Sequence, residues 1–319
     1  MEKNKKVNFS VIYDKYIARL LPVISLLLMV VIFGILTEGK SLAPRNLNNL
    51  LNQGVITAVV ATGATFIYAS GSFDISLGAA TAVSAIIGAM AYNYTGSIPV
   101  MFLVCILTAM VILGFSSVAS TLLRLPVFIV TIVMMSVLTA LQELLLKGQN
   151  YSVDRTFLKP LETNGLKYLV FLVFFLFCVI LFHFTRFGRG IKLMGGNRNT
   201  AEQTGISTAK YTILAFMVAA IGVGLGAALT IIRAGTISGT TASSLGMDVM
   251  IAIVLGGMAI SGGAKSYMYS ATVGTILVYM LNNGLTIMRV DNGIIQAVRG
   301  ALFLVLILLA TKKQNLLPR

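Results

Sequence analysis

Asp74 is the residue whose chemistry most needs explaining, because it is the only charged residue between Arg45 and Arg124. It lies within YASGSFDISLGAATAV (68–83), among small residues and glycines. If this stretch spans a membrane, an ionisable group there costs on the order of 3 kcal/mol and normally faces a cavity or a partner. Asp74 then has three possible roles: to cap the helix that begins near Ser76, to line a polar path, or to exchange protons.

Capping ranks first among these roles. A carboxylate just before a helix is favourable through its hydrogen bonds and the helix dipole. Gly71 and Gly78 also mark a break in the apolar sequence, and the backbone groups of such a break need partners. Phe73 and Ser76 belong to the same break. Path lining is second and is compatible with capping, and proton exchange is third.

Two further acids lie at the ends of apolar runs. We interpret Glu143 as an interfacial residue. Asp248 begins an apolar run just after SGTTASS (238–244), whose hydroxyls indicate a loop on the outer face. We expect that loop to be solvated, with docking of a partner as the weaker alternative.

Catalytic and metal-binding patterns are absent from the sequence. GGAKS around Lys265 has Ala264 where a phosphate-binding loop needs glycine, so we expect no ATP on this chain. There is no HExxH or GxSxG, and the single histidine, His183, lies near the end of an apolar run. We therefore expect no catalytic residue, no metal and no cofactor, so any work the protein does must draw energy from elsewhere.

Composition indicates one membrane domain over residues 1–319. Of the 319 residues, 57% are hydrophobic and only 11% are charged, whereas soluble domains carry about 25% charged residues. The net charge of +14 does not point to nucleic acid, because the basic residues cluster between apolar runs as in the positive-inside pattern. Cys105 and Cys178 lie within apolar runs, so we expect no disulfide.

Apolar runs long enough for membrane helices predict an all-α polytopic protein, since a span needs roughly 20 residues. About ten spans fit the sequence, and the first has no cleavage site of a signal peptide. The expected spans are 18–37, 53–70, 77–93, 99–122, 126–146, 167–185, 211–232, 247–262, 267–283 and 293–311. The second, third, eighth and ninth are short enough for one to be a half-helix.

The basic clusters set the expected orientation. They place the N-terminal segment 1–17, the loop 186–210 and the C-terminus in the cytoplasm, with the loop 147–166 outside. A possible internal repeat has the same orientation in both halves. At an offset of 191 residues, Ser70-Gly71 matches Ser261-Gly262 and Ala80-Thr81 matches Ala271-Thr272. Transporters often contain such duplicated, interrupted helices, although small residues also recur in ordinary helix bundles.

The cytoplasmic loop RFGRGIKLMGGNRNTAEQTGISTAKY (186–211) contains signals for a short helix. Gly195 and Gly196 break the preceding structure, and Asn197 to Thr200 offers several N-cap residues. Among them, Thr200 with Gln203 has capping-box spacing. We expect a helix from Ala201 to about Gln203 that ends at Gly205. There are two interpretations of this loop: a solvated loop whose charges only set the membrane topology, or a docking site for a cytosolic partner. Composition alone favours the first.

Four blocks resemble the permease subunits of ribose-type ATP-binding-cassette importers. LMGGNRNTAEQTGI resembles their coupling-helix loop, with Gly195, Gly196, Asn197, Ala201, Gly205 and Ile206 matching and Thr200 substituted. Gly71, Asp74, Ser76 and Gly78 match a GGIDLSVG segment, and DVMIAIVLGGMAISGG (248–263) and NNGL (282–285) also fit. The chain departs at Gly246, where the family frequently has glutamate, and around Lys265 and Tyr269.

The resemblance implies a sugar permease of the bacterial inner membrane. It implies three partners. A cytosolic ATPase uses the ATP and docks at 195–206, and an extracytoplasmic binding protein supplies the sugar. A second permease subunit, identical or different, lies beside this one in the lipid bilayer. One alternative is a proton-coupled secondary transporter with Asp74 as its proton site. An integral membrane transferase ranks lowest, because the acids are scattered rather than convergent.

Overall fold

The computed structural model describes residues 18–154, 156, 158–163 and 165–314. The expected cytoplasmic segment 1–17 lies outside the described residues. The helices begin and end as follows: α2 (Ala18–Leu36), the 3₁₀ turn η2 (Lys40–Leu42), α3 (Pro44–Ala69), α4 (Leu77–Thr95), α5 (Ile98–Leu122), α6 (Val127–Leu146), α7 (Lys159–Thr163), α8 (Leu166–Phe184), α9 (Arg186–Gly196), α10 (Arg198–Gln203), α11 (Thr208–Ala234), α12 (Leu245–Leu255), α13 (Tyr269–Ile287) and α14 (Asn292–Gln314).

The chain is an all-α polytopic membrane protein, with one small exception to the helical pattern. Strand β1 (Tyr151–Ser152) pairs antiparallel with β2 (Thr236–Ile237). Within the described residues, five helices are long and apolar enough to cross a bilayer: α3, α5, α6, α8 and α11. A helix overlaps each of the ten expected spans, but the number of crossings stays a prediction.

The eighth expected span, 247–262, is the half-helix among the four short spans. Helix α12 ends at Leu255 and has only 11 residues. At 1.5 Å per residue it covers roughly half of the hydrocarbon core. Glycines end it, because Gly257 and Gly262 have positive φ angles of 89° and 69°. Residues 256–268 therefore form an irregular connection to α13.

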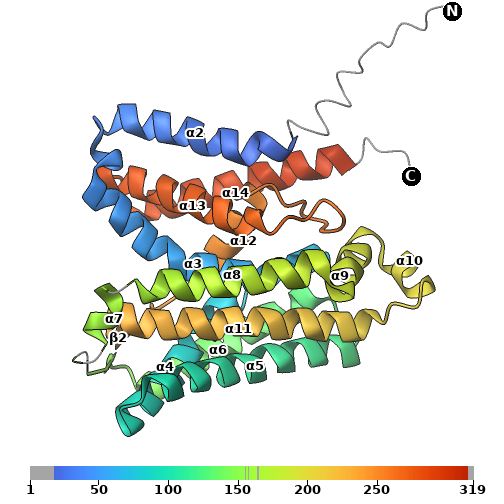
Figure 1. Ribbon diagram of the computed structural model, residues 1–319, viewed down its shortest axis with the longest axis horizontal. Coiled ribbons are helices and arrows are strands. Elements are labelled where there is room, and N and C mark those ends of the chain that lie inside the picture. Colours follow the sequence, from blue (N-terminus) through green and yellow to red (C-terminus); the bar gives the residue numbers. More distant parts are fainter. Residues whose placement is uncertain (1–17, 155, 157, 164, 315–319) are drawn as a thin grey trace, which may run out of the picture.

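Helices α3 and α11 form the centre of the bundle. Both are mostly buried, and α11 packs along α3 and α5. Small residues allow this close approach: a Cβ added at Gly63 would lie 3.1 Å from the Ala219 Cα atom, and one at Gly224 only 2.4 Å from the Ile106 Cα atom. In Figure 1, α2, α13 and α14 form one group of helices, and α4, α5, α6 and α11 lie in another.

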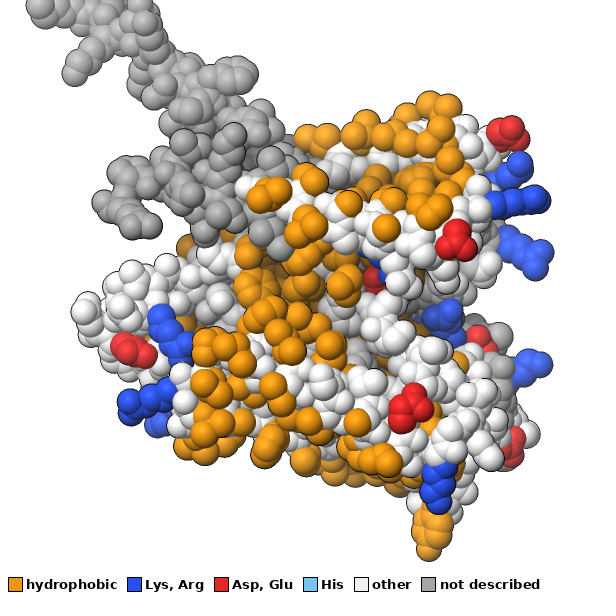
Figure 2. Space-filling model, turned by 180° about the vertical axis from the view of Figure 1, so that it is seen from behind, with side chains coloured by type: hydrophobic (Ala, Val, Ile, Leu, Met, Phe, Trp, Pro, Cys, Tyr) orange, Lys and Arg blue, Asp and Glu red, His pale blue; other side chains and the backbone are white. Residues whose placement is uncertain are grey.

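The outward faces of α5 and α8 are apolar, as contact with lipid requires. Leu107, Val111 and Phe115 on α5 and Leu172 and Leu176 on α8 are all more than half exposed. Figure 2 shows hydrophobic side chains over both groups of helices and a hollow between the groups that contains acidic and basic side chains.

The two ends of the molecule carry different loops. The β1–β2 pair joins the expected outer loop 147–166 to the segment 235–244, which contains the expected outer loop 238–244, at one end of the molecule. Helices α9 and α10 lie at the other end, where α2 begins and α14 ends (Figure 1). This arrangement puts both described chain ends on the side of the expected coupling loop, and the orientation of that side toward the cytoplasm remains a prediction.

Helix bounds recur along the chain and support the expected internal repeat. Helix α13 begins and ends 192 residues after α4, one residue more than the expected offset. The connection 70–76 before α4 thus corresponds to the connection 256–268 before α13. Each half contains a helix, a glycine-containing break and two further helices.

Candidate functional site

Asp74 is completely buried in the break between α3 and α4. Its Oδ1 atom accepts hydrogen bonds from the Ser76 backbone N–H at 2.7 Å and from the Ser76 hydroxyl at 2.6 Å. These bonds fix the turn into α4, although they act on Ser76 rather than on the first N–H groups of the helix. Oδ2 is buried without a hydrogen-bond partner. Because Asp74 is fully enclosed, a ligand cannot reach its carboxylate in this conformation.

The break also brings the two halves of the chain together. The ring of Phe73 packs edge-on against Tyr68, with 5.2 Å between their centroids. A Cβ at Gly78 would lie 2.6 Å from the Ala242 carbonyl oxygen, and one at Gly246 would lie 2.5 Å from the Ile75 carbonyl oxygen. The glutamate that the related segment frequently has at position 246 would therefore not fit without movement. The start of α4 and the start of α12 form one tightly packed contact.

Asp248 lies in the first turn of α12, where the helix dipole favours a negative charge. Its Oδ1 atom lies 3.0 Å from Nη1 of Arg299 on α14, but the geometry of this ion pair gives Oδ1 no hydrogen bond. Oδ2 accepts a hydrogen bond from the Ser244 hydroxyl at 3.2 Å. Sequence reasoning missed Arg299. Its charge within the expected span 293–311 was the available signal, because a buried cation needs a partner.

The coupling loop begins with a helix that was not expected. Helix α9 follows a cap in which the Thr185 hydroxyl accepts from the Gly188 N–H at 3.2 Å. Its buried side includes Ile191 and Met194, with Phe187 partly buried. This spacing of four and three residues is typical of an amphipathic helix. The helix was not predicted because its sequence is rich in glycines and charged residues. Lys192 lies over the Phe182 ring at 4.2 Å, and desolvation lowers the pKa of its ammonium group.

The N-cap of the next helix is one of the expected candidates, Asn197, rather than the Thr200 of the expected capping box, and the expected end of the helix is confirmed. Helix α10 starts at Arg198, and Asn197 is the N-cap because its Oδ1 atom accepts from the Thr200 N–H at 3.1 Å. At the other end, Gly205 has φ +83°. Its N–H bonds to the Glu202 carbonyl at 2.9 Å, and the Ile206 N–H bonds to the Ala201 carbonyl at 3.1 Å. These two bonds form a Schellman motif.

Ala201 lies within the loop 195–206 at which the resemblance implies that an ATPase docks, but its side chain is not available for docking. It is only 2% exposed and faces this chain. The exposed residues of the loop are the ones available to a partner. They include Gly196, Asn197, Arg198, Asn199, Thr200, Glu202, Gln203 and Gly205.

Three glycine-containing segments meet where α9 ends. The Gly263 N–H donates to the Ala69 carbonyl at 2.9 Å, which joins the break after α12 to the end of α3. A Cβ at Gly195 would lie 2.0 Å from the same Ala69 oxygen and 2.6 Å from the Gly263 nitrogen. A Cβ at Gly71 would lie 3.0 Å from the Ser261 carbonyl oxygen and 3.5 Å from the Gly195 Cα atom. The coupling loop is thus packed directly on both helix breaks, and we name this contact the glycine junction.

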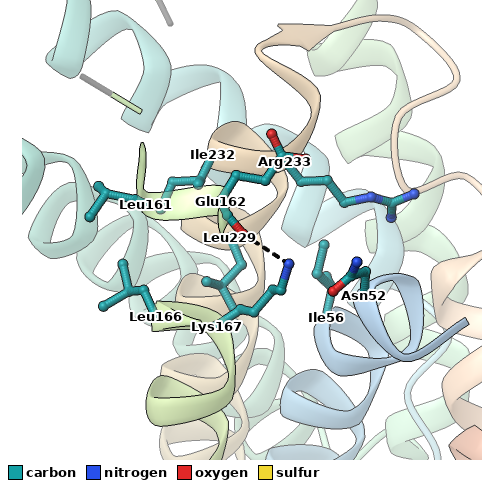
Figure 3. A pocket seen from close by; sticks show the side chains of 9 residues that line it. All are labelled: Asn52, Ile56, Leu161, Glu162, Leu166, Lys167, Leu229, Ile232 and Arg233. Atoms are coloured by element: carbon teal, nitrogen blue, oxygen red, sulfur yellow. Dashed lines mark hydrogen bonds between the residues drawn. The ribbon is translucent and has the colours of Figure 1, made fainter. Parts of the chain in front are cut away.

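Two cavities lie near the outer ends of α3 and α11. The smaller has a volume of about 30 Å³. Figure 3 shows that Lys167 there points to the backbone oxygen of Glu162, a hydrogen bond of 3.0 Å, while Arg233 extends away from it. The larger has a volume of about 400 Å³ and is lined by Asp248, Tyr279 and Arg233 among others. Asp74 lines neither cavity.

The sequence is similar to curated sugar permeases along almost its whole length. The ribose import permease protein of Bacillus subtilis (strain 168) is 28% identical, and the alignment covers 98% of this chain and 97% of the relative. The fructose import permease protein of Rhizobium meliloti is 25% identical, with coverage of 85% and 79%. The D-allose transport system permease protein of Escherichia coli (strain K12) is 24% identical, with coverage of 95% and 93%.

No solved structure matches the chain significantly. The family of membrane permeases described as "branched-chain amino acid transport system / permease component" matches residues 46–311, which include both helix breaks, the glycine junction and the coupling loop. The chain therefore belongs to this family of transport subunits.

Proposed function

We propose that the protein is the membrane-spanning permease subunit of a bacterial ATP-binding-cassette importer for a monosaccharide or a related polyol. The observation that carries this proposal is the full-length similarity to import permeases named for ribose, fructose and D-allose. The family description names branched-chain amino acids, so leucine is the informative comparison substrate.

Separate cytosolic ATPase subunits would supply the energy and bind the ATP. The exposed side of α10 supports docking there, because the helix is short, held at both ends by capping bonds and placed at one end of the molecule. Movement of α10 would reach the helix breaks through α9 and the glycine junction. The chain itself needs no catalytic residue in this scheme, because the bond that is cleaved belongs to ATP on its partner.

An extracytoplasmic binding protein would deliver the sugar to the opposite end. The paired loops 147–166 and 235–244 are the surface available to it. A second permease subunit, identical or different, would complete the path in the inner membrane. Asp74 and Asp248 mark the two discontinuous elements of each subunit, where transporters commonly place their transport path.

The second candidate function is a proton-coupled secondary transporter, and the observation that favours it is the buried Oδ2 atom of Asp74. A buried carboxylate with an unsatisfied oxygen is a group that protonation would stabilise. In that case the protein would transport sugar alone, driven by a proton gradient.

Purification of the chain together with its neighbouring gene products tests the main proposal. The chain should copurify with an ATPase, and in liposomes the ATP hydrolysis of the complex should rise when a binding protein loaded with ribose, fructose or D-allose is added. Leucine should give no stimulation. A chain that purifies without an ATPase and catalyses sugar uptake alone would overturn the proposal.

A further inference from the structure

The larger cavity has the dimensions of a small-molecule site. Its volume of about 400 Å³ falls within the range of ligand pockets. Its walls come from α3, α11, α12 and α13, so both halves of the repeat contribute to it. The lining residues are Gln53, Ile56, Thr57, Thr230, Arg233, Ala234, Ala242, Ser244, Leu245, Asp248 and Tyr279.

The position of the cavity suits a ligand that enters from the side of the binding protein. Arg233 and Ala234 are the last residues of α11, directly before the β2 strand of the outer loops. Asp248 lies deeper, one turn into the short helix α12. The cavity thus extends from the outer end of the bundle toward the contact between the starts of α4 and α12.

Asp248 offers an acceptor in the wall of the cavity. Its Oδ1 atom is buried against Nη1 of Arg299, 3.0 Å away. Its Oδ2 atom accepts one hydrogen bond, from the Ser244 hydroxyl at 3.2 Å, and a carboxylate oxygen has about two lone-pair positions, so Oδ2 can accept a second bond. The guanidinium of Arg299 also donates to the Asn282 side-chain oxygen, which holds it in place. Since Arg299 neutralises the carboxylate, this wall favours neutral hydroxyl donors over a cation.

The remaining wall combines hydroxyl groups with apolar side chains. The Tyr279 and Thr57 hydroxyls are 2.7 Å apart and form one hydrogen bond, in which either group can donate. Ile56 and Leu245 supply apolar surface. A monosaccharide has the same combination, because its hydroxyls surround a ring that carries C–H groups.

We infer that this cavity is a binding site for a neutral polyhydroxylated ligand, a monosaccharide or polyol, on its way through the protein. Asp248 accepts a hydrogen bond from a ligand hydroxyl through Oδ2, and the Tyr279 hydroxyl, which the buried Thr57 hydroxyl holds in place, exchanges hydrogen bonds with the ligand. The inference rests on the proposed function and adds to it a residue-level site. With such a site, the permease contributes to the selection of the transported sugar, in addition to the binding protein.

A cysteine at Thr230 tests whether sugar occupies the cavity. The Thr230 hydroxyl bonds only to the Gly226 carbonyl of its own helix, so Thr230→Cys leaves the Asp248 pair intact. The complex of permease, ATPase and binding protein is exposed to a small thiol reagent from outside, with and without ribose, fructose and D-allose. The transported sugar should slow labelling about tenfold at a concentration ten times its Kd. Tyr94→Cys, in an exposed residue at the outer end of α4, is the control that no sugar should protect.

Two substitutions test the assigned contacts. Tyr279→Phe removes only a hydroxyl, and Asp248→Asn combined with Arg299→Gln removes both charges together. Each should lower sugar uptake about tenfold through the loss of ligand hydrogen bonds and should change the relative rates for the three sugars, while ATPase copurification stays normal. Glu38→Gln, at an exposed acid, is the control for both properties.

The inference is overturned if no sugar slows the labelling of Thr230→Cys, or if both contact variants keep the uptake rates and sugar preferences of the unaltered protein. Either result leaves the importer function intact. Failure of the proposed function gives a different result: the unaltered complex then shows no sugar-stimulated ATP hydrolysis, and the inferred site falls with it.

Discussion

The carboxylate of Asp74 is a structural acceptor at the start of α4, and its two bonds to Ser76 explain why a charged residue lies within so apolar a region. Its second oxygen has no partner, so burial there costs stability unless another conformation satisfies it. Sequence reasoning identified the residue and the break. It did not identify Ser76 as the donor, because the choice of donor depends on the turn geometry.

Asp74→Asn should keep the acceptor oxygen and reduce transport only partly, whereas Asp74→Leu should impair both assembly and transport. Loss of the bonds to a buried group costs about 1–3 kcal/mol. Membrane levels and sugar uptake measure the two effects. Asp154→Asn is a matched control, because Asp154 makes the same two bonds to Thr156, at 3.0 and 2.7 Å, in an exposed loop.

Complete loss of uptake in Asp74→Asn, in a preparation where uptake follows a proton gradient, would contradict the structural role of Asp74. That result would favour the proton-coupled alternative.

Gly205 ends α10 because of its backbone conformation rather than its contacts. Its φ is +83°, and no heavy atom lies within 4 Å of an added Cβ. Gly205→Val should therefore strain the Schellman motif by about 1–2 kcal/mol and weaken copurification of the ATPase. Gly205→Asn should be tolerated, since asparagine accepts this conformation. Equal copurification of both variants with wild-type yield would refute this explanation.

At the scale of elements, the sequence predicted the position of each long helix and allowed one of four short spans to be a half-helix. It predicted neither α9 nor which of the four spans is the half-helix. Hydrophobic runs are strong signals for long helices. Helix α9 contains four glycines within 11 residues, and these residues lower helix propensity. Packing explains their presence: Gly188, Gly190 and Gly195 each lie where a Cβ would clash with a neighbouring segment. Such contacts between distant segments cannot be predicted from local sequence.

The glycine junction predicts different effects for substitutions at the two adjacent glycines Gly195 and Gly196. Gly195→Ala places a Cβ against the Ala69 oxygen, whereas Gly196→Ala points into open space. The first substitution should destabilise the protein by about 1–3 kcal/mol and lower sugar uptake per ATP hydrolysed. The second should leave the stability unchanged. Thermal unfolding of the complex in detergent and the uptake-to-hydrolysis ratio measure both, and identical behaviour of the pair would disprove transmission through the junction.

At the scale of the whole molecule, the expected orientation can be tested with two cysteines. Leu193 on α9 is 57% exposed, and Thr156 lies in an exposed outer loop. Leu193→Cys should react with an impermeant thiol reagent only from the cytoplasmic side, and Thr156→Cys only from outside. The native Cys105 and Cys178 are buried and should react slowly. Labelling of both introduced cysteines from one side would contradict the topology.

The central claim is that ATP hydrolysed by a partner drives sugar through this chain. Its most direct test is uptake of labelled ribose, fructose and D-allose into liposomes that contain the assembled complex and enclosed ATP. The loaded binding protein is outside, and a protonophore removes any proton gradient. We predict uptake of at least one sugar that requires both ATP and the binding protein and is unaffected by the protonophore. Uptake that proceeds without ATP and stops when the protonophore is added would contradict the claim.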